Sequence, residues 1–528
     1  MSLSTPAAAP ARTPSWRRAA LAVTVGVALV VPAVPASAEP VVAEGASTPS
    51  STPTSTSTAT AAAPATTTAT TTATKVTLGS RLTAILNDPR SATESDVSVL
   101  DAGTGKVVYA RRATSANMPA SNTKILTAAA AMHVLGPRYR FTTDVVRREP
   151  VRDGVLRGSL YLVGHGDPTT RQSDYAALAA EVRAAGIRKV TGPLVADGSF
   201  FDSQRYNPGW STSYASAYYA AQTAALTVAP NADLDAGTVI VKVTGVRGKK
   251  PTLSTTPAAA KAYVRLVNKA STASSTSVSL SRALGGNTIT VRGHVRSGAS
   301  WSGLVTVDKP ELYAAAVFRR ELARQHVEVE GGTTLAKTPA SRRTRVARDT
   351  SMPLSQLLVP FLKLSNNLHA EALTKTMGTL GGRPGTWSAG LARTTAYLRR
   401  LGVPMAGVSL TDGSGVSRRN RVTPRAMATV LVKVRRESWW SAFDAGLPVA
   451  GVDSHLGGGT LRHRMGGTRA AANAHAKTGT LTGVTALSGY VTGRDGRRYA
   501  FSMISNYAGT TPRPVEDELV VALAGWRG

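Results

Sequence analysis

Hydrophobic and polar residues alternate differently in successive parts of the chain, and each pattern predicts an element. Valines at both ends of residues 97–108 flank a turn-rich gap at 101–105, which predicts a β-hairpin. An apolar, alanine-rich run at 125–135 ends at Gly136 and predicts a helix that starts near Ser121. Since alanine lets neighbouring elements approach closely, we expect this helix to be buried and central.

The middle of the chain, 146–345, has mainly the two-residue alternation of β structure. The clearest strands are predicted at 238–243 and 288–291. After Pro310 the apolar residues recur at spacings of three and four, which predicts a helix. We expect this region to form two inserted, largely β domains.

The C-terminal part predicts another hairpin and a final helix. Two apolar runs, 487–491 and 499–504, flank a turn containing Asp495 and Gly496. The helix is predicted over 515–523. Together with the earlier elements, this pattern indicates a mixed α+β fold.

The N-terminal segment 1–38 resembles a secretory signal peptide. Three arginines precede an apolar stretch, 19–31, and an A-x-A-like site ends at Ala38. An uncleaved anchor is the alternative, but the apolar stretch meets Pro32 and is shorter than the roughly 20 residues that cross a bilayer. We expect export and cleavage after Ala38.

Residues 39–76 are rich in Thr, Ser, Ala and Pro and predict a disordered linker or a glycosylated stalk. The whole chain has 528 residues, enough for several domains, with 62 Lys and Arg against 31 Asp and Glu. Its net charge of +31 falls to +28 without the three arginines of the leader. The charge therefore belongs to the folded part.

A strongly basic exported protein has three candidate partners: nucleic acid, anionic lipid and anionic wall polymers. Aromatic residues make up only 5%, and no RNA-recognition or zinc-finger motif is present, so nucleic acid is not expected. Two short basic clusters, 342–345 and 418–421, are interpreted as solvated surface. The summed charge predicts salt-dependent attraction to an anionic wall polymer.

The sequence contains no cysteine, which excludes disulfides, a thiol nucleophile and Cys-ligated metal sites. A covalent catalyst would then be a serine with a nearby base. Ser121 and Lys124 are three residues apart at a predicted helix start, where they share a face and lie beside unpaired backbone N–H groups. By itself this S-x-x-K motif arises often by chance.

Two further motifs make the pattern specific. Ser365-Asn366-Asn367 follows Ser121 by 244 residues, and Lys477-Thr478-Gly479-Thr480 begins another 112 residues on. The order S-x-x-K, S-x-N, K-T-G resembles the penicillin-binding protein and serine β-lactamase superfamily.

Over residues 80–525 the chain resembles one family within that superfamily. This is the D-alanyl-D-alanine carboxypeptidase/endopeptidase family, the class C low-molecular-mass penicillin-binding proteins. The long interval between the first two motifs is typical of that family, which carries two inserted domains there. The segments that match the family's sequence motifs are 118–124, 164–168, 364–367, 412–415, 459–461 and 476–480.

The resemblance implies a penicillin-binding protein/β-lactamase-like catalytic domain, with an antiparallel sheet flanked by helices. This domain would be split between 77–145 and 346–528, with the inserted domains at 146–345. The implied protein is a secreted or wall-associated serine peptidase that trims or cleaves peptidoglycan stem peptides. β-Lactams would acylate it, and no cofactor or metal is implied.

The resemblance also assigns roles. Ser121 would attack the carbonyl between two D-alanines, with Lys124 as base, and the backbone N–H groups of Ser121 and Thr480 would form the oxyanion hole. Ser365 would relay a proton. Asn367 would donate to the peptide carbonyl of the substrate.

The K-T-G segment would hold the end of the substrate. Lys477 is implied to attract the terminal carboxylate, and Thr478 and Thr480, on either side of Gly479, add hydroxyls. The edge of the strand that carries them could bind the peptide by strand addition.

Alternatives remain at this point. A β-lactamase-like hydrolase would share Ser121 and Lys124, and a non-catalytic wall-binding protein would use only the charge. The segment 412–415 is interpreted as a structural turn that borders the cleft. The sequence does not rank carboxypeptidase against endopeptidase activity, nor does it give the oligomeric state.

Overall fold

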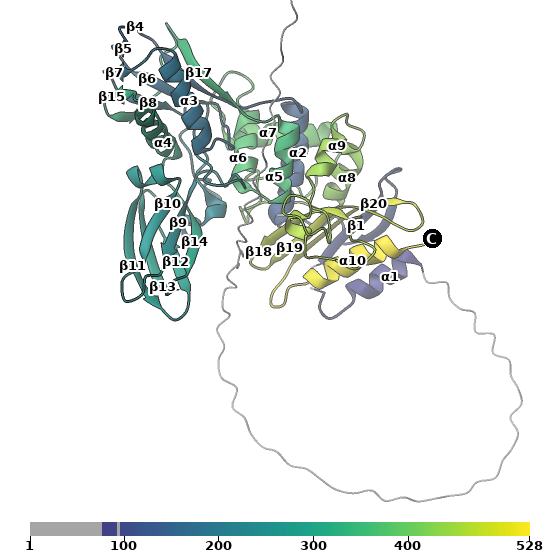
Figure 1. Cartoon of the computed structure of the whole chain (residues 1–528). Coiled ribbons are helices and arrows are strands. Elements are labelled where there is room, and N and C mark those ends of the chain that lie inside the picture. The colour runs from purple at the N-terminus through teal and green to yellow at the C-terminus, as the bar shows by residue number, and fades with distance from the viewer. Residues whose placement is uncertain (1–76, 92–94) are drawn as a thin grey trace, which may run out of the picture. The chain divides into compact units, whose positions relative to one another are not determined.

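A computed structural model describes residues 77–91 and 95–528 (Figure 1). They belong to one unit of the chain, Thr74–Gly528. The predicted leader, 1–38, and the predicted linker, 39–76, lie outside the described residues. Over the described ranges, no helix combines the length and the apolar character needed to cross a membrane.

Five antiparallel strands from the beginning and the end of the described chain form one sheet, in the order β18-β19-β20-β1-β2. β1 pairs with β20 from Ser95 opposite Ser505 to Asp101 opposite Tyr499. Both predicted hairpins are confirmed, as β1–β2 and β19–β20. The strands are β1 Ser95–Asp101, β2 Val107–Arg111, β18 His475–Leu481, β19 Val484–Thr492 and β20 Arg498–Asn506.

Helices cover both faces of this sheet (Figure 1). On one face, α1 (Leu78–Leu86) and α10 (Arg513–Gly525) share an apolar cluster with Val97 and Phe501. α10 confirms the predicted final helix. The helices of the other face are α2 Thr123–Val134, α5 Leu354–Lys363, α6 Asn367–Gly378, α7 Trp387–Arg400, α8 Pro424–Val434 and α9 Trp440–Gly446.

Helix α2 is the predicted buried helix. Its residues from 123 to 132 are all buried, and four successive alanines, 128–131, have no exposed surface. Neighbouring helices can approach closely because methyl groups are small. Ser121 lies just ahead of α2, in the short 3₁₀ turn η1, Ala120–Asn122.

Two paired strands connect the central sheet and its helices to the inserted region. β3 (Thr142–Arg147) and β17 (Thr344–Thr350) are antiparallel neighbours in a sheet of order β16-β8-β6-β3-β17. The expected boundaries at 145/146 and 345/346 fall inside these strands. The other strands of this region are β4 Val151–Arg152, β5 Val155–Leu156, β6 Leu160–Gly164, β7 Lys189–Val190, β8 Leu194–Asp197, β15 Glu328–Val329 and β16 Thr333–Leu335.

Two helices accompany these strands. α4 (Pro310–Arg324) is the helix predicted after Pro310, with the proline in the first turn. α3 (Gln172–Ala184) is not among the predicted elements. Its buried stripe is narrow and partly made of alanine, so its apolar periodicity is weak.

Six further strands form two three-stranded sheets, β10-β9-β14 and β11-β13-β12. They include the strands predicted at 238–243 and 288–291. Their bounds are β9 Thr238–Thr244, β10 Thr252–Thr256, β11 Arg265–Ala273, β12 Ser277–Ser281, β13 Thr288–Arg296 and β14 Ser300–Thr306.

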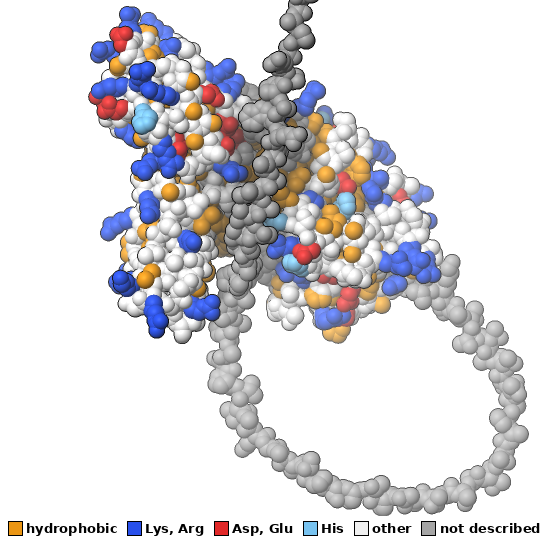
Figure 2. Space-filling view, viewed as in Figure 1, with side chains coloured by type: hydrophobic (Ala, Val, Ile, Leu, Met, Phe, Trp, Pro, Cys, Tyr) orange, Lys and Arg blue, Asp and Glu red, His pale blue; other side chains and the backbone are white. Residues whose placement is uncertain are grey.

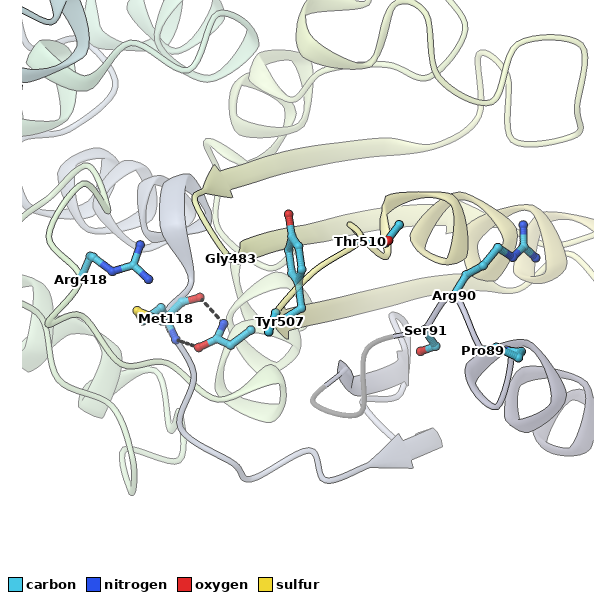
Figure 3. Close-up of a pocket in the computed structure, with 10 residues that line it drawn as sticks. Pro89, Arg90, Ser91, Met118, Arg418, Gly483, Tyr507 and Thr510 are labelled. Atoms are coloured by element: carbon cyan, nitrogen blue, oxygen red, sulfur yellow. Dashed lines mark hydrogen bonds between the residues drawn. The ribbon is translucent and has the colours of Figure 1, made fainter. Parts of the chain in front are cut away.

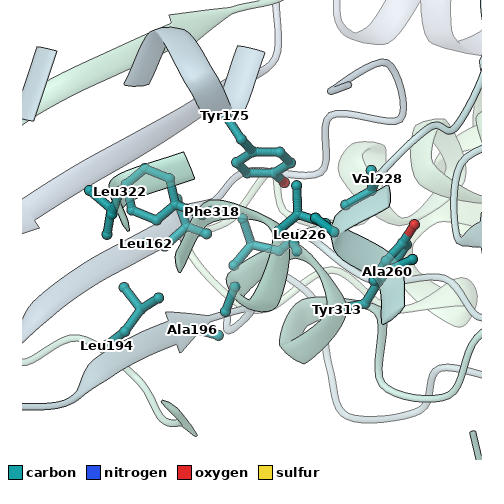
Figure 4. Packing of buried hydrophobic residues seen from close by; sticks show 14 of the residues in the cluster. Leu162, Tyr175, Leu194, Ala196, Leu226, Val228, Ala260, Tyr313, Phe318 and Leu322 are labelled. Atoms are coloured by element: carbon teal, nitrogen blue, oxygen red, sulfur yellow. The ribbon is translucent and has the colours of Figure 1, made fainter. Parts of the chain in front are cut away.

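One apolar cluster joins these strands to α3 and α4 (Figure 4). Tyr175 on α3 and Phe318 on α4 lie beside Leu162 and Leu194 from the sheet (Figure 4). The buried hydroxyl of Tyr175 donates to the carbonyl of Thr227 at 2.7 Å, so its polar end is satisfied inside the core. The inserted region thus has one apolar core, which includes residues of the sheet β16-β8-β6-β3-β17 and of the two three-stranded sheets.

Candidate active site

Ser121 and Lys124 are brought together at the start of α2. The Lys124 Nζ donates to the Ser121 Oγ at 2.9 Å. The η1 turn carries the serine and the first turn of α2 carries the lysine, so their three-residue spacing puts both on one face. The predicted contact between the two side chains is confirmed.

Lys124 is completely buried and has two more acceptors. Its Nζ donates to Asn367 Oδ1 at 2.6 Å and to the Ser414 carbonyl at 2.8 Å. Burial lowers the pKa of Lys124 to about 7, although the charges of Asp412 and Glu371 act in the opposite direction. The amine can therefore exchange a proton near neutral pH.

The carbonyl that Lys124 contacts belongs to a loop held by two buried carboxylates. Glu371, on α6, accepts the backbone N–H of Ser414 at 2.9 Å and that of Gly413 at 3.1 Å. Asp412 accepts the N–H of Gly415 at 2.8 Å. The segment 412–415, interpreted from sequence as a structural turn, thus supplies a direct contact to the lysine.

Gly415 is required at this turn for two reasons. Its φ is +87°, and a Cβ there would lie 1.8 Å from the carbonyl oxygen of Ala120. The loop therefore packs directly against the turn that carries Ser121.

The S-x-N motif forms the connection between α5 and α6. Ser365 is half-buried and has a left-handed backbone, with φ of +61°. Asn366 caps α6 by accepting from the N–H of His369. Asn367 begins α6, and its side chain accepts from Lys124 and donates to the carbonyl of Tyr219 at 2.6 Å.

Tyr219 lies in the 3₁₀ turn η3, Tyr218–Ala220, far from the three motifs in sequence. Its carbonyl joins the inserted region to the same asparagine that contacts the lysine. No motif signals this residue, because a backbone carbonyl can come from any residue type.

Strand β18 carries the third motif along the edge of the central sheet. Lys477 is buried, and burial together with the charge of Lys124 places its pKa well below the ordinary lysine value. Its Nζ donates to the carbonyl of Thr478 at 2.8 Å. At Gly479 a Cβ would lie 2.7 Å from the Pro119 carbonyl oxygen, so glycine lets β18 approach the segment before Ser121.

Two side chains border the threonines of β18. The Thr478 hydroxyl donates to the Thr460 hydroxyl at 2.9 Å, and Thr460 lies in the turn η5, Gly459–Leu461. Arg513, exposed at the start of α10, has its Nη2 3.4 Å from the Thr480 Oγ1. Sequence reasoning does not single out Arg513, which lies 33 residues beyond Thr480 in the chain.

A pocket of about 670 Å³ lies past the end of β18, at the turn that leads into β19 (Figure 3). Met118, Arg418, Gly483 and Tyr507 are among its lining residues. Asn506 fixes Met118 by accepting its N–H at 3.0 Å and donating to its carbonyl at 3.2 Å. The pocket therefore borders the segment that leads to Ser121, although none of the eight motif residues proposed for the site lines it.

A buried lysine that contacts a serine, beside an edge strand with a second buried lysine, is an arrangement suited to serine acyl transfer. The chain belongs to the D-Ala-D-Ala carboxypeptidase 3 (S13) family, whose model matches residues 78–525. It is a D-alanyl-D-alanine carboxypeptidase with a penicillin-binding protein fold, as the sequence predicts.

Known proteins agree with this assignment. The chain is 41% identical over 466 residues to the D-alanyl-D-alanine carboxypeptidase of an Actinomadura species. The aligned residues cover 85% of this chain and 86% of the relative. It is 29% identical to carboxypeptidase DacB of Haemophilus influenzae over 397 residues, covering 74% and 80% of the two chains.

The fold is that of a solved relative. The crystal structure of penicillin binding protein 4 from Haemophilus influenzae superposes with a TM-score of 0.73 at 25% identity, covering 84% of this chain and 99% of that one. The same protein has also been solved in complex with a novel β-lactam.

Proposed function

We propose that this chain hydrolyses the D-Ala-D-Ala ends of peptidoglycan stem peptides through an acyl-enzyme on Ser121. The observation that carries the proposal is the 2.9 Å contact between Ser121 and a buried lysine whose pKa is about 7. A serine hydroxyl is weakly acidic and needs such a base within hydrogen-bond reach.

In the proposed acylation, the Ser121 Oγ attacks the carbonyl carbon between the two D-alanines, and its proton passes to the neutral Lys124 amine. A C–O bond forms, and the oxyanion lies against the backbone N–H groups of Ser121 and Thr480. When the C–N bond breaks, the proton held by Lys124 passes through Ser365, the proposed relay, to the amine of the leaving D-alanine, and Lys124 is neutral again. In deacylation, water gives a proton to Lys124 and its oxygen attacks the ester carbonyl; the C–O bond to Ser121 breaks, the Ser121 Oγ takes that proton back, and the shortened peptide leaves.

The remaining motif residues would hold the substrate. Asn367 keeps one amide hydrogen for the peptide carbonyl after donating the other to Tyr219. Thr478 and Thr480 would bind the terminal carboxylate through their hydroxyls. Arg513 places an exposed guanidinium beside Thr480, where it could also pair with that carboxylate.

Endopeptidase activity is proposed as a second use of the same acyl-enzyme. The supporting observation is the position of β18 at the outer edge of its sheet, where an extended peptide can add as a further strand. A crosslinked donor then needs only room beyond the carboxylate site.

β-Lactams are proposed to acylate Ser121 in place of the peptide. We also propose that the leader 1–38 directs export, that cleavage follows Ala38, and that the mature enzyme works outside the membrane near anionic wall polymers. N-terminal sequencing of the exported protein tests the cleavage site, with Glu39 as the expected first residue.

The test of the main activity uses a soluble peptide that ends in D-Ala-D-Ala. Wild-type chain should release D-alanine, and Ser121→Ala should release none above the uncatalysed level. A crosslinked muropeptide dimer, assayed in parallel, measures endopeptidase activity. Equal D-alanine release by Ser121→Ala would overturn the proposal.

A further inference from the structure

The sheet β11-β13-β12 has an outer face that is basic and lacks any carboxylate. Arg265 and Lys269 lie on β11, and Arg292 and Arg296 lie on β13; all four are exposed. We call these four residues the basic face.

The pairing register puts the four residues on one side of the sheet. Lys269 is directly opposite Arg292, and Arg296 is opposite Ala273. Since side chains alternate between the two sides of a strand, residues 265, 269, 292 and 296 share a side. The intervening residues Ile289, Val291 and Val295 point into the apolar core.

The basic charge of this region is not balanced locally. From 236 to 307 the sequence contains ten Lys and Arg and no Asp or Glu. On the lobe formed by β9 to β14, the side seen in Figure 2 has blue basic side chains and no red acidic ones. Charges here therefore have no intramolecular counter-ion close in sequence.

Two like charges directly opposite each other cost folding free energy. Lys269 and Arg292 form a cross-strand pair of like charges, which is destabilising. Neighbouring positions of this face carry Ser or Thr, which would avoid the repulsion. An external anion that binds both would remove the repulsion. The pair thus indicates a surface suited to a ligand rather than to stability.

The face is long and carries hydroxyl groups between its charges. Arg265 and Arg296 lie at opposite ends of the β11–β13 pair, about 26 Å apart at roughly 3.3 Å per residue. Ser277, Ser279 and Ser281 on β12 lie opposite β13 residues of this face. A single small anion cannot span it, but an extended polymer with repeated negative charges can.

The turn between β9 and β10 extends the charge at one end. It contributes the exposed residues Arg247, Lys249 and Lys250. Gly245 in this turn forms a bridge with Ser297, next to Arg296. The positive surface therefore continues around the end of the sheet.

We infer that the basic face binds a linear phosphodiester polymer of the cell wall and so holds the enzyme beside its peptide substrate. Three of its four charges are guanidinium groups, which match phosphate geometry. The only ring on the face is the imidazole of His294, with no Trp, Tyr or Phe to stack successive bases, and its apolar residues, Val267 and Ala273, are too small to anchor in a bilayer. The inference rests on the proposed extracytoplasmic function.

The test measures binding of the chain to immobilised poly(glycerol phosphate), the variant being R265Q/K269Q/R292Q/R296Q. Wild type should bind with an affinity that falls about tenfold or more between 50 and 200 mM salt, as charge contacts require. The variant should bind about tenfold more weakly. The matched control, R152Q/R157Q/R188Q/R320Q, removes the same charge from exposed residues elsewhere and should bind as wild type within about twofold.

An equal loss in both quadruple variants would overturn the inference, because net charge alone would then explain binding. Tighter binding to single-stranded DNA or to anionic lipid vesicles at the same salt would also overturn it. Cleavage of a soluble D-Ala-D-Ala peptide is measured separately and should be unchanged in both variants. A chain that binds the polymer but cleaves no peptide contradicts the proposed function and still supports the basic face.

Discussion

Glu371 and Ser414 are joined by a hydrogen bond that fixes one acceptor of Lys124. The Glu371 carboxylate accepts the Ser414 N–H at 2.9 Å, and the carbonyl of the same serine accepts from Lys124 at 2.8 Å. Both Glu371 and Lys124 are fully buried. The geometry and the protonation of Lys124 therefore depend on a carboxylate 247 residues away in the chain.

Replacing this carboxylate should change the pH dependence of acylation. Burial raises the pKa of Glu371 itself to about 7, so its charge, which raises the pKa of Lys124, is present mainly at and above neutral pH; Glu371→Gln removes that charge and lets the lysine lose its proton at a lower pH. The acidic limb of the acylation rate should move to lower pH. Second-order acylation rates with a penicillin between pH 5 and 9 measure the shift.

Glu371→Gln should also lower the free energy of unfolding by about 1–3 kcal/mol. The reason is that a buried N–H of Gly413 or Ser414 loses its charged acceptor, a carboxylate oxygen of Glu371. The thermal midpoint of the same preparation records this loss. An unchanged pH profile in a variant that folds would show that Glu371 does not tune the lysine.

The wild-type enzyme should itself depend on pH in a defined direction. Lys124 has a pKa of about 7 and acts as a base only when neutral, so acylation should rise as pH increases through 7 and level off above it. Lys124→Ala should lower the acylation rate by about 10²–10⁴-fold and lose this limb. Acylation of Lys124→Ala at the wild-type rate would exclude the lysine as the base.

Arg513 should contribute to recognition of the substrate carboxylate. Its Nη2 lies 3.4 Å from the Thr480 hydroxyl, and a charged hydrogen bond to a carboxylate contributes about 1.5–3 kcal/mol. Arg513→Gln should lower kcat/KM for a D-Ala-D-Ala peptide by about tenfold or more, mainly through KM. The matched control is Arg497→Gln, another exposed arginine, which should leave both constants unchanged.

The buried ion pair between Arg464 and Glu516 should contribute to stability. Arg464 Nη2 lies 3.0 Å from Glu516, whose side chain has no exposed surface, and 2.7 Å from Asp517. Arg464→Ala leaves the Glu516 carboxylate buried without its cation and should cost about 3–5 kcal/mol. Urea denaturation measures the change in the free energy of unfolding.

A surface pair provides the comparison for this prediction. Arg497 lies 3.8 Å from Asp495 and its side chain is 64% exposed. Arg497→Ala should change stability by less than about 1 kcal/mol. Equal effects of the two alanine variants would contradict the importance of the buried pair.

Much of the fold could be predicted from residue patterns. The hairpins around 101–105 and 493–497, the alanine-rich helix and the helix after Pro310 all have strong local signals, and the structure confirms them. Helix α3 has no such signal. The pairing of β1 with β20 also lies beyond local patterns, because it joins residues about 400 positions apart.

Only part of the candidate site could be predicted from the sequence. Ser121 and Lys124 are three residues apart, so helical geometry predicts their contact. Glu371 and Tyr219 reach the site through contacts between segments far apart in the chain, and one of them uses only its backbone carbonyl. Such contacts depend on tertiary packing, which spacing along the sequence does not encode.

The central claim is that Ser121 is the acylated nucleophile. The most direct measurement incubates the chain with a penicillin, follows its intact mass over time, and maps the modified peptide. The account predicts a long-lived adduct of one drug molecule on the peptide that contains Ser121, and none on Ser121→Ala. An adduct on another residue, or an equal adduct on Ser121→Ala, would contradict it.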